Sequence, residues 1–449
     1  MFSPRFLHTA FPIAPLVSFR LVFGAVMLFS TLRFWYLGWI EEHFLQAKIH
    51  FKYFGFEWVQ VLPAEWMYAL HALMALAALG IMLGAFYRVS AAVFFLSFTY
   101  VQLIDLTYYL NHYYFVSLTS LLLLFVPANG RFSVDAWRKG RIQMEAPRWT
   151  ILIFQAQIAI VYFYAGLAKI NYAWLIEAMP LRIWAPANDT LPLIGPLLRW
   201  EWTPWVFSWA GMLYDTTIVA WLSWPRTRLL AYLSVIFFHG VTGMMFQIGV
   251  FPIVMVGATW VYFSPRFHEQ LLQFLERWSA KVVKKRSELT LMTSAKPLPH
   301  VLLWRNGLLA AYFAFQLLFP WRYLLYPGNL FWTEEGYRFS WRVMLMEKAG
   351  TAIFYVKDGK TGREGVVDNG EFLCAHQEKQ MSMQPDMILQ YAHFLANHYQ
   401  KQGLENPSVR AEVYVTLNAQ SSRLLFDPQL DLTKIKDSWA HKTWISPYQ

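Results

Sequence analysis

A single lysine, Lys169, lies near the end of the apolar segment YFYAGLAKIN, residues 162–171. Lysines at the ends of membrane helices commonly extend their amines to the lipid headgroups, so a structural role is one interpretation. The small residues Ala165, Gly166 and Ala168 favour another, because they let a neighbouring helix approach closely and hold the lysine inside a bundle. A desolvated amine loses its proton more readily, and a neutral lysine is a usable base.

Three further polar residues belong to the same end of the predicted bundle. The segment DLTYYLNHYYF places Asn111 and His112 beside four tyrosines, and FFHGVTGMMFQIGVF places His239 in the outer half of its segment. Each histidine could make only a structural hydrogen bond between helices. We prefer that interpretation for His239, whereas we favour membership of a site for Asn111 and His112.

The sequence lacks the motifs of several other enzyme classes. It has no HExxH or similar close pair of ligands, so metal catalysis is disfavoured. It also has no G-x-G-x-x-G after a strand, no Walker loop and no G-x-S-x-G elbow. Cys374 is the only cysteine, which excludes an intrachain disulfide, a cysteine-based zinc site and an iron–sulfur cluster.

The composition is that of a membrane protein. Hydrophobic residues make up 57% of the 449 residues and charged residues only 15%. The first apolar run, residues 17–40, is too long for a signal-peptide core and lacks a cleavage site, so we expect it to stay as a membrane anchor. The net charge of +10 does not indicate a nucleic-acid partner, because basic residues of membrane proteins gather in cytoplasmic loops.

The apolar pattern predicts an all-α membrane bundle of about nine transmembrane helices. Each span needs about 20 residues. The predicted spans are residues 17–40, 64–86, 90–107, 112–128, 149–170, 204–224, 229–247, 248–263 and 302–320. If the N-terminus is cytoplasmic, most lysines and arginines fall in the cytoplasmic loops, as is usual for membrane proteins. An odd number of spans then places the C-terminus on the extracytoplasmic side.

The composition changes at Pro320, so we divide the chain into a multi-pass domain, residues 1–320, and a second domain, residues 321–449. In the second, TAIFYVKDGKTGREGVV is typical of two strands joined by a turn, and RAEVYVTLN of a further strand. PDMILQYAHFLANHYQKQG is typical of an amphipathic helix ended by Gly403. The sequence thus predicts a small extracytoplasmic α+β domain.

These motifs resemble one family, the vitamin K-dependent γ-glutamyl carboxylases. The similarity extends from RLVFGAVM to HKTWISP, through YLNHYYF, YFYAGLAKINYAWL, FFHGVTGMMFQIGVF, LYPGNLFWTEEGYRFSWRVML and LLFDPQLDL. The membrane part alone is similar to a broader set of horizontally transferred transmembrane (HTTM) proteins. The outer module, with its FSW segment, resembles the carboxylase proper.

The resemblance implies a reaction of reduced vitamin K, as phylloquinone or menaquinone hydroquinone, with O2 and CO2 as co-substrates and no metal. In the family, a lysine deprotonates the hydroquinone, oxidation to the epoxide generates a strong base, and that base removes a γ-proton from a protein glutamate, to which CO2 adds. Lys169 matches this lysine, and Asn111 with His112 matches a pair that helps to hold the reacting oxygens. The implied quinone contacts are His239, Tyr323, Trp332 and Tyr337, and the implied glutamate contacts are Trp332, Ser340 and Trp341.

The outer rim of the membrane suits this chemistry, because a strong base needs a dry site, the isoprenoid tail needs lipid and the glutamate arrives from water. The expected partners are therefore membrane lipid and a glutamate-containing protein or peptide.

The sequence departs from the family pattern at several places. Ala168 stands where the animal enzymes carry a second lysine, and Tyr323 where many members carry histidine. The chain is shorter than the animal enzymes and cannot form their disulfide, so propeptide-directed processing is not implied. A prokaryotic homologue in the inner or plasma membrane is expected.

Other functions remain open at this point. An enzyme could oxidise the hydroquinone to its epoxide without carboxylating glutamate. A non-enzymatic membrane protein could bind quinone or lipid only. A transporter is disfavoured, because the sequence shows no paired inverted halves with broken helices and its polar candidates gather at one rim.

Overall fold

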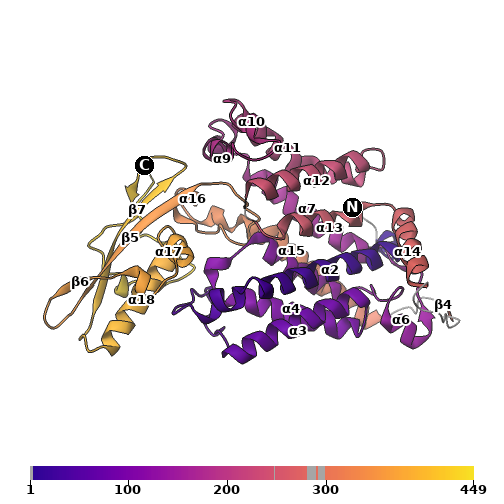
Figure 1. Cartoon of the computed structure of the whole chain (residues 1–449), viewed down its shortest axis with the longest axis horizontal. Helices are drawn as coiled ribbons and strands as arrows, with labels where there is room; N and C mark the ends of the chain where they lie inside the picture. The colour runs from indigo at the N-terminus through magenta and orange to yellow at the C-terminus, as the bar shows by residue number, and fades with distance from the viewer. Residues whose placement is uncertain (1–3, 247, 281–289, 292–298, 449) are drawn as a thin grey trace.

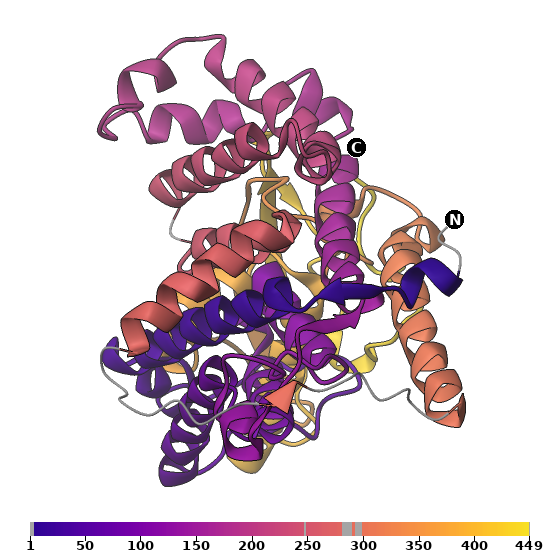
Figure 2. The same ribbon diagram turned by 90° about the vertical axis from the view of Figure 1, so that its right-hand side faces the viewer.

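The computed structural model describes residues 4–246, 248–280, 290–291 and 299–448. Figure 1 shows a bundle of helices with a small sheet at one end. The C-terminus lies on the sheet side, and the N-terminus lies near the opposite end of the helices. In Figure 2, turned by 90°, the helices stand in front of the sheet.

Within the described residues, six helices are long and apolar enough to cross a membrane. They are α2 (Ala14–Tyr36), α3 (Ala64–Leu83), α4 (Tyr87–Ile104), α7 (Trp149–Ala168), α12 (Arg228–Met245) and α15 (Pro299–Leu318), the last continuing into the 3-10 helix η4 (Phe319–Leu325). The chain is therefore a membrane protein by its apolar helices, but the expected count of about nine spans is not confirmed.

The other three predicted spans form helices that differ from full spans. Helix α5 (Asn111–Leu123) has 13 residues, and α13 (Phe251–Thr259) continues only through the 3-10 helix η3 (Trp260–Tyr262). Helix α11 (Thr203–Ser223) is long enough at 21 residues, but it is less apolar and carries Asp215. All three pack against the longer helices, so they complete the bundle whether or not each crosses a membrane.

Close packing of small residues holds the long helices together. A Cβ atom on Gly24 of α2 would lie 2.5 Å from the backbone nitrogen of Met82 in α3, so only glycine allows this approach. The buried apolar cluster includes Ile13, Phe94, Phe154 and Tyr262 and reaches Trp341. Because these helices are apolar on most sides, both the core and the outer surface of the bundle are apolar.

Short elements connect the long helices. They are α1 (Pro4–Leu7), the π-helix η1 (Glu41–Leu45), the 3-10 helix η2 (Leu106–Tyr108), α6 (Val134–Lys139), α8 (Tyr172–Leu175), α9 (Leu181–Ala187), α10 (Gly195–Leu198) and α14 (Pro265–Ala280). Two small strand pairs join β1 (Ala10–Pro12) to β3 (Glu145–Pro147) and β2 (Arg141–Ile142) to β4 (Thr290–Leu291).

The C-terminal sheet has the order β6-β5-β7-β8 and is antiparallel throughout. Its strands are β5 (Lys348–Lys357), β6 (Glu364–Val366), β7 (Ser408–Leu417) and β8 (Arg423–Leu424). Alternate residues of β7 are buried, as expected for a sheet covered on one face. The remaining elements are α16 (Leu330–Thr333), the 3-10 helices η5 (Asn369–Glu371) and η6 (Leu432–Lys434), α17 (Ala375–Met381) and α18 (Pro385–Lys401). Figure 1 shows α17 and α18 beside β5 and β7, in agreement with the α+β prediction for this region.

The sheet domain is joined to the bundle by buried contacts. Phe51, Tyr53 and Leu106 from the bundle loops belong to the same apolar cluster as Phe354 of β5. Asp105, at the end of α4, accepts hydrogen bonds from the Thr107 backbone and side chain and from Gln377 of α17, and lies 3.1 Å from Nδ1 of His50. The C-terminal domain therefore rests directly on the end of the bundle.

Candidate active site

Lys169 follows directly after α7 and is buried in the protein. Its side-chain nitrogen donates a hydrogen bond to Oδ2 of Asp215 at 2.6 Å and another to the carbonyl of Ala165 at 3.2 Å. Lys169 is 6% exposed and Asp215, in α11, is 5% exposed. The amine therefore faces a counter-ion inside the bundle and does not extend to lipid headgroups.

The close approach of α7 and α11 brings this pair together. A Cβ atom on Gly166 would lie 2.6 Å from Cγ2 of Thr216 and 2.8 Å from its backbone nitrogen. The sequence argument that small residues before Lys169 admit a neighbouring helix is thus confirmed. Trp174 closes the same corner, since its ring centroid lies 5.4 Å from the Lys169 nitrogen and its indole donates to the carbonyl of Ser208 in α11.

A cavity of about 410 Å³ adjoins the ion pair. We call it the lysine cavity. Its polar lining residues include Asn111, His112, Tyr162, Lys169, Tyr214, Asp215 and His239, and its apolar lining includes Phe251, Trp341 and Met344. This volume falls within the range of about 300–1,000 Å³ typical of small-molecule sites. Five of the predicted site residues, Lys169, Asn111, His112, His239 and Trp341, therefore meet around one space.

Phe251 packs against both histidines. The ring of Phe251 is 5.3 Å, centroid to centroid, from both His112 and His239. Nε2 of His239 lies 3.0 Å from the hydroxyl of Tyr162, which joins α12 to α7 as the structural interpretation expects. Its Nδ1 is buried and has no hydrogen-bond partner in the part of the chain that the structure describes.

Asn111 links the start of α5 to a segment more than two hundred residues later. Its Oδ1 accepts a hydrogen bond from the hydroxyl of Tyr109 at 3.0 Å. Its Nδ2 donates to the backbone carbonyl of Arg342 at 2.8 Å. Because both ends of the amide are engaged by protein groups, Asn111 positions the wall of the lysine cavity.

That wall is the segment of residues 336–344, which we call the wall segment. Phe339, Trp341 and Met344 have φ values of 59°, 59° and 52°, and Gly336 has 81°. Left-handed backbone at residues other than glycine is uncommon and clusters at functional sites. Neighbouring side chains of the wall segment point into different cavities. Trp341 lines the lysine cavity, whereas Ser340 and Arg342 line a second cavity.

The second space, about 620 Å³, is the arginine cavity. It lies between the end of α7 and the C-terminal domain, and its lining includes Ala168, Asn171, Glu177, Tyr323, Ser340, Arg342, Asn418, Arg423 and Tyr448. The guanidinium of Arg342 stands 4.2 Å from the ring centroid of Tyr323, and that of Arg423 stands 5.1 Å from Tyr448. Nε of Arg342 is buried without a hydrogen-bond partner among the described residues. Stacked guanidinium groups of this kind suit carboxylate ligands.

Two predicted contacts lie elsewhere. Trp332 is 1% exposed in the apolar core of the C-terminal domain, and its indole donates to the carbonyl of Ser446 at 2.8 Å. Tyr337 packs its ring against Phe331, and its carbonyl accepts a hydrogen bond from Ser340. Neither residue lines the lysine cavity or the arginine cavity, whereas Tyr323 and Ser340 line the arginine cavity.

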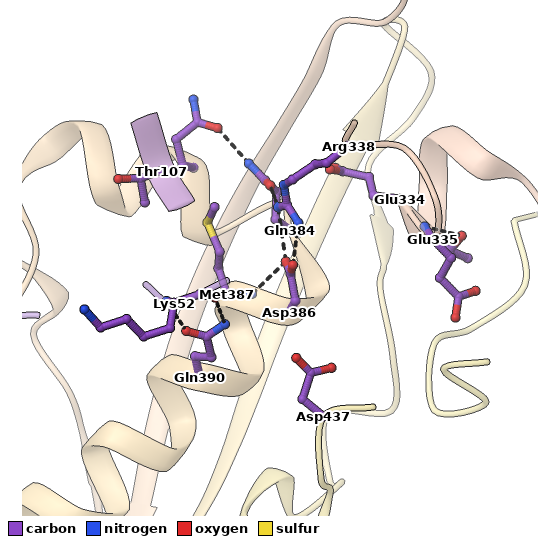
Figure 3. A network of polar contacts seen from close by, with 12 residues as sticks. Lys52, Thr107, Glu334, Glu335, Arg338, Gln384, Asp386, Met387, Gln390 and Asp437 are labelled. Atoms are coloured by element: carbon purple, nitrogen blue, oxygen red, sulfur yellow. Dashed lines mark hydrogen bonds and ion pairs between the residues drawn. The ribbon is translucent and has the colours of Figure 1, made fainter. Parts of the chain in front are cut away.

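A buried polar network fastens the wall segment to the C-terminal domain (Figure 3). Arg338 donates to Oδ2 of Asp386 at 2.5 Å and also to the side chain of Gln384, both at the start of α18. Burial alone would raise the pKa of Asp386, but the charge and hydrogen bonds of Arg338 outweigh it and lower that pKa. Nearby, Gln390 exchanges two hydrogen bonds with the backbone of Lys52, which ties α18 to the loop after η1.

Sequence reasoning missed Asp215, Arg342 and Arg423. Asp215 carries a usable signal, since it is the only charged residue in the otherwise apolar helix α11. The two arginines carry none, because they lie far apart in the sequence and only the fold brings them to one cavity. Among the described residues, no group of three or more His, Cys, Asp or Glu side chains is arranged to hold a metal ion.

The comparisons with known proteins agree with this architecture. Residues 9–267, more than half of the chain, match the HTTM domain. Residues 303–449 match the lumenal domain of vitamin K-dependent gamma-carboxylase. No solved structure matches the chain.

The bundle and its buried polar site thus define an HTTM membrane protein. Because the lumenal domain follows, the chain belongs to the vitamin K-dependent gamma-carboxylase family, as its motifs predicted. The same match indicates that the C-terminal region is extracytoplasmic.

Proposed function

We propose that this protein is a vitamin K-dependent gamma-carboxylase that converts protein glutamate to γ-carboxyglutamate and oxidises vitamin K hydroquinone to its epoxide. Phylloquinone or menaquinone hydroquinone, O2 and CO2 are the co-substrates. The observation that carries the proposal is the buried Lys169–Asp215 pair beside a cavity that also holds Asn111 and His112.

The lysine cavity fits a flat aromatic hydroquinone. Aromatic side chains line it, and two buried donor or acceptor atoms, Nδ1 of His239 and Nε1 of Trp341, have no partner among the described residues. Buried polar atoms usually have hydrogen-bond partners, so a ligand with oxygens at its edges would satisfy them. When bound, the hydroquinone supplies the electrons that reduce O2 and the strong base that the γ-proton of glutamate requires.

The ion pair gives Lys169 a way to act as a base. Transfer of the proton from the Lys169 nitrogen to Oδ2 of Asp215, across 2.6 Å, leaves a neutral amine and a neutral acid. This transfer changes no net charge within the site. The neutral amine then accepts a hydroxyl proton of the hydroquinone.

His112 and Asn111 orient the reacting groups. His112 is 6% exposed and lines the cavity, where its ring can meet an oxygen atom of a bound ligand. Asn111 keeps the carbonyl of Arg342 in place and thereby sets the wall segment. The site thus fixes geometry before the substrate binds, which lowers the entropic cost of bringing the reacting groups together.

The arginine cavity receives the glutamate-containing polypeptide. Arg342 and Arg423 have no carboxylate partner among the described residues, and their guanidinium groups can each bind a carboxylate through two hydrogen bonds. The cavity contains one acidic residue, Glu177. Acidic side chains of a protein or peptide substrate are therefore the ligands that we assign to it.

We place the multi-pass bundle at residues 1–320 and the extracytoplasmic domain at residues 321–449, with the N-terminus cytoplasmic. The distribution of basic residues and the position of the N-terminus at the end of the helices opposite the sheet support this orientation. It puts Lys169 near the outer membrane boundary, where lipid, water and a dry cavity meet. The prokaryotic inner or plasma membrane is the location that we propose.

One assay separates the proposal from its rivals. Purified protein receives vitamin K hydroquinone, a glutamate-containing peptide and labelled CO2, and both epoxide and incorporated label are measured. We expect both products, and loss of both in Lys169→Ala. Epoxide without label would indicate a quinone epoxidase, and turnover unaltered by Lys169→Ala would indicate that this lysine is not the base.

A further inference from the structure

A third cavity, of about 500 Å³, lies on the other side of α5 from the lysine cavity. We call it the tyrosine cavity, because Tyr53, Tyr109, Tyr113, Tyr114 and Tyr326 are among its lining residues. Helices α4, α5 and α15 form its inner part, and the C-terminal domain forms its outer part. In the proposed reaction, none of its lining residues is assigned a contact with the reacting groups.

The lining is apolar at one end and charged at the other. Phe95 of α4, Leu121 of α5 and Phe315 of α15 belong to the apolar end. Phe315 and Leu110 also line the cavity while 49% and 39% exposed, so the cavity opens on the apolar outer surface of the bundle. A membrane surrounding these helices would place acyl chains at that opening.

At the charged end, three of the carboxylates have cation partners of their own. Asp386 pairs with Arg338 at 2.5 Å and Glu334 with Lys348 at 2.8 Å. Asp437 pairs with Lys442 at 3.0 Å. Figure 3 shows Asp386 joined to Arg338 by dashed lines, with Glu334 beside Arg338 and Asp437 below Asp386 in this view.

Arg322, unlike the other cations named at this end of the cavity, is not paired with a carboxylate among the described residues. Its guanidinium donates to the carbonyl of Phe319 at 3.1 Å and to the carbonyl of Arg338, and it stands 4.0 Å from the ring centroid of Phe319. It has no carboxylate partner in the described part of the chain, and its other N–H groups remain available. Arg322 follows the apolar end of α15 and thus stands where the apolar and charged linings meet.

We propose that the tyrosine cavity binds one glycerophospholipid, with the phosphate on Arg322 and an acyl chain between α4, α5 and α15. The apolar lining accommodates the chain, and an unpaired guanidinium recognises phosphate through charge-assisted hydrogen bonds. A lipid without phosphate would leave Arg322 without a counter-ion, and a phosphate without a chain would leave the apolar part empty. The site is therefore specific for the combination.

The bound lipid would lie next to tyrosines that contact the wall segment. The hydroxyl of Tyr109, a lining residue, accepts a hydrogen bond from the backbone of Phe339 at 2.8 Å and donates to Asn111 at 3.0 Å. The rings of Tyr109 and Tyr114 lie 4.9 Å and 5.0 Å from that of Phe339. Filling the cavity stabilises this group of rings and thus the contact between the bundle and the C-terminal domain.

The experiment uses full-length protein in detergent, stripped of lipid, and measures the Tm after addition of three ligands. These are dioleoylphosphatidylglycerol, dioleoylglycerol without phosphate, and glycerol 3-phosphate without acyl chains. We expect a saturable rise in Tm with the phospholipid alone, and one retained phospholipid in native mass spectrometry. An equal rise with dioleoylglycerol or with glycerol 3-phosphate, or no rise with any ligand, would overturn the proposal.

Variants locate the site. Arg322→Gln removes the phosphate contact and is expected to weaken phospholipid binding about tenfold, the effect of one charge-assisted hydrogen bond. Leu121→Trp fills the apolar part without changing charge and is expected to abolish the rise in Tm. Arg363→Gln is the matched control, because Arg363 is an exposed arginine of the C-terminal domain away from the cavity. Wild-type binding by both site variants would contradict the assignment, and none of these readouts depends on enzymatic activity.

Discussion

The side-chain nitrogen of Lys169 and Oδ2 of Asp215 lie 2.6 Å apart, although 46 residues separate them in the sequence. Each group would be a costly buried charge without the other. Burial of either group therefore depends on the packing of α7 against α11, which brings the two together. The pair therefore serves two purposes that experiments can separate, namely stability and proton transfer.

Removing one member of the pair is expected to destabilise the protein more than removing both. Asp215→Leu leaves a buried ammonium without a partner and should lower the free energy of unfolding by about 3–5 kcal/mol. The double variant Lys169→Met with Asp215→Leu replaces both charges by apolar groups and should recover most of that loss. Thermal unfolding in detergent measures both effects.

Activity should not follow stability in this series. The double variant has no amine, so it should form no vitamin K epoxide even where its Tm is close to that of the wild type. Epoxide formation by the stable double variant would show that the base lies elsewhere. A double variant as unstable as Asp215→Leu would show that the pair is not the source of the effect.

The distance between α7 and α11 should control activity without any change of an ionisable group. Gly166→Val pushes against Thr216, whose backbone nitrogen would lie 2.8 Å from the new Cβ, and so separates Lys169 from Asp215. A displacement of about 1 Å at a reacting group can lower the rate about 100-fold. Epoxide formation should fall to that extent.

Gly307→Ala is the control for this prediction. Gly307 lies in α15, and a Cβ there would meet open space, so the substitution should leave Tm and rate close to those of the wild type. Equal loss of activity in both glycine variants would indicate a general sensitivity of the bundle to glycine replacement.

The sequence predicted the elements well where one local pattern decides them. Apolar runs located the helices, and alternation located β7. The count of about nine spans is not confirmed, because length and apolarity in the sequence do not reveal where a helix ends. Helix α5, for example, runs from Asn111 to Leu123, whereas the predicted span was residues 112–128.

The site was predictable for residues that stand out in apolar surroundings, such as Lys169 and His112. Asp215 stood out equally in α11 but was overlooked. Arg342 could not be predicted, because its role depends on the left-handed backbone of the wall segment, which sends Trp341 and Arg342 to different cavities. Trp332, which its motif position implied as a contact, lies in an apolar core and lines neither the lysine cavity nor the arginine cavity.

Arg342 and Arg423 should govern the affinity for the peptide. Arg342→Gln or Arg423→Gln removes one guanidinium from the arginine cavity and should raise the KM for a glutamate-containing peptide about tenfold. The KM for the hydroquinone should change little, because neither side chain lines the lysine cavity. Arg363→Gln, on an exposed loop, should match the wild type in both constants.

Salt offers an independent check of the same prediction. If carboxylates bind these guanidinium groups, a higher ionic strength should raise the peptide KM of the wild type more than that of either variant. A peptide KM unchanged by both substitutions would remove the arginine cavity from substrate binding, while the assignment of Lys169 would stand on its own assay.

The Arg338–Asp386 pair should make the stability of the protein depend on acid pH. The pKa of Asp386 is lower in the folded protein than the usual value of about 3.9, so the pair contributes stability above that pH. This contribution is lost as the pH falls through the lowered pKa and the carboxylate is protonated. Asp386→Asn should therefore be less stable than the wild type at pH 7, by about 1.5–3 kcal/mol.

The difference between Asp386→Asn and the wild type should shrink as the pH falls below about 4. Thermal unfolding over a range of acid pH values measures it. A difference that stays constant over this range would mean that Asp386 stabilises the wall segment through shape and not through charge.

Asn111 and Tyr109 should act as one unit in positioning the wall segment. Asn111→Asp keeps the acceptor for Tyr109 but replaces the donor to the carbonyl of Arg342, and Tyr109→Phe removes the hydroxyl that bridges Asn111 and Phe339. Each variant should lower kcat more than it raises the KM for hydroquinone, because the cavity remains while its geometry loosens. Since both variants break the same chain of hydrogen bonds, the double variant should lose less than the product of the two single losses. Losses that multiply without coupling would show that Asn111 acts on the bound hydroquinone directly and not through the wall segment.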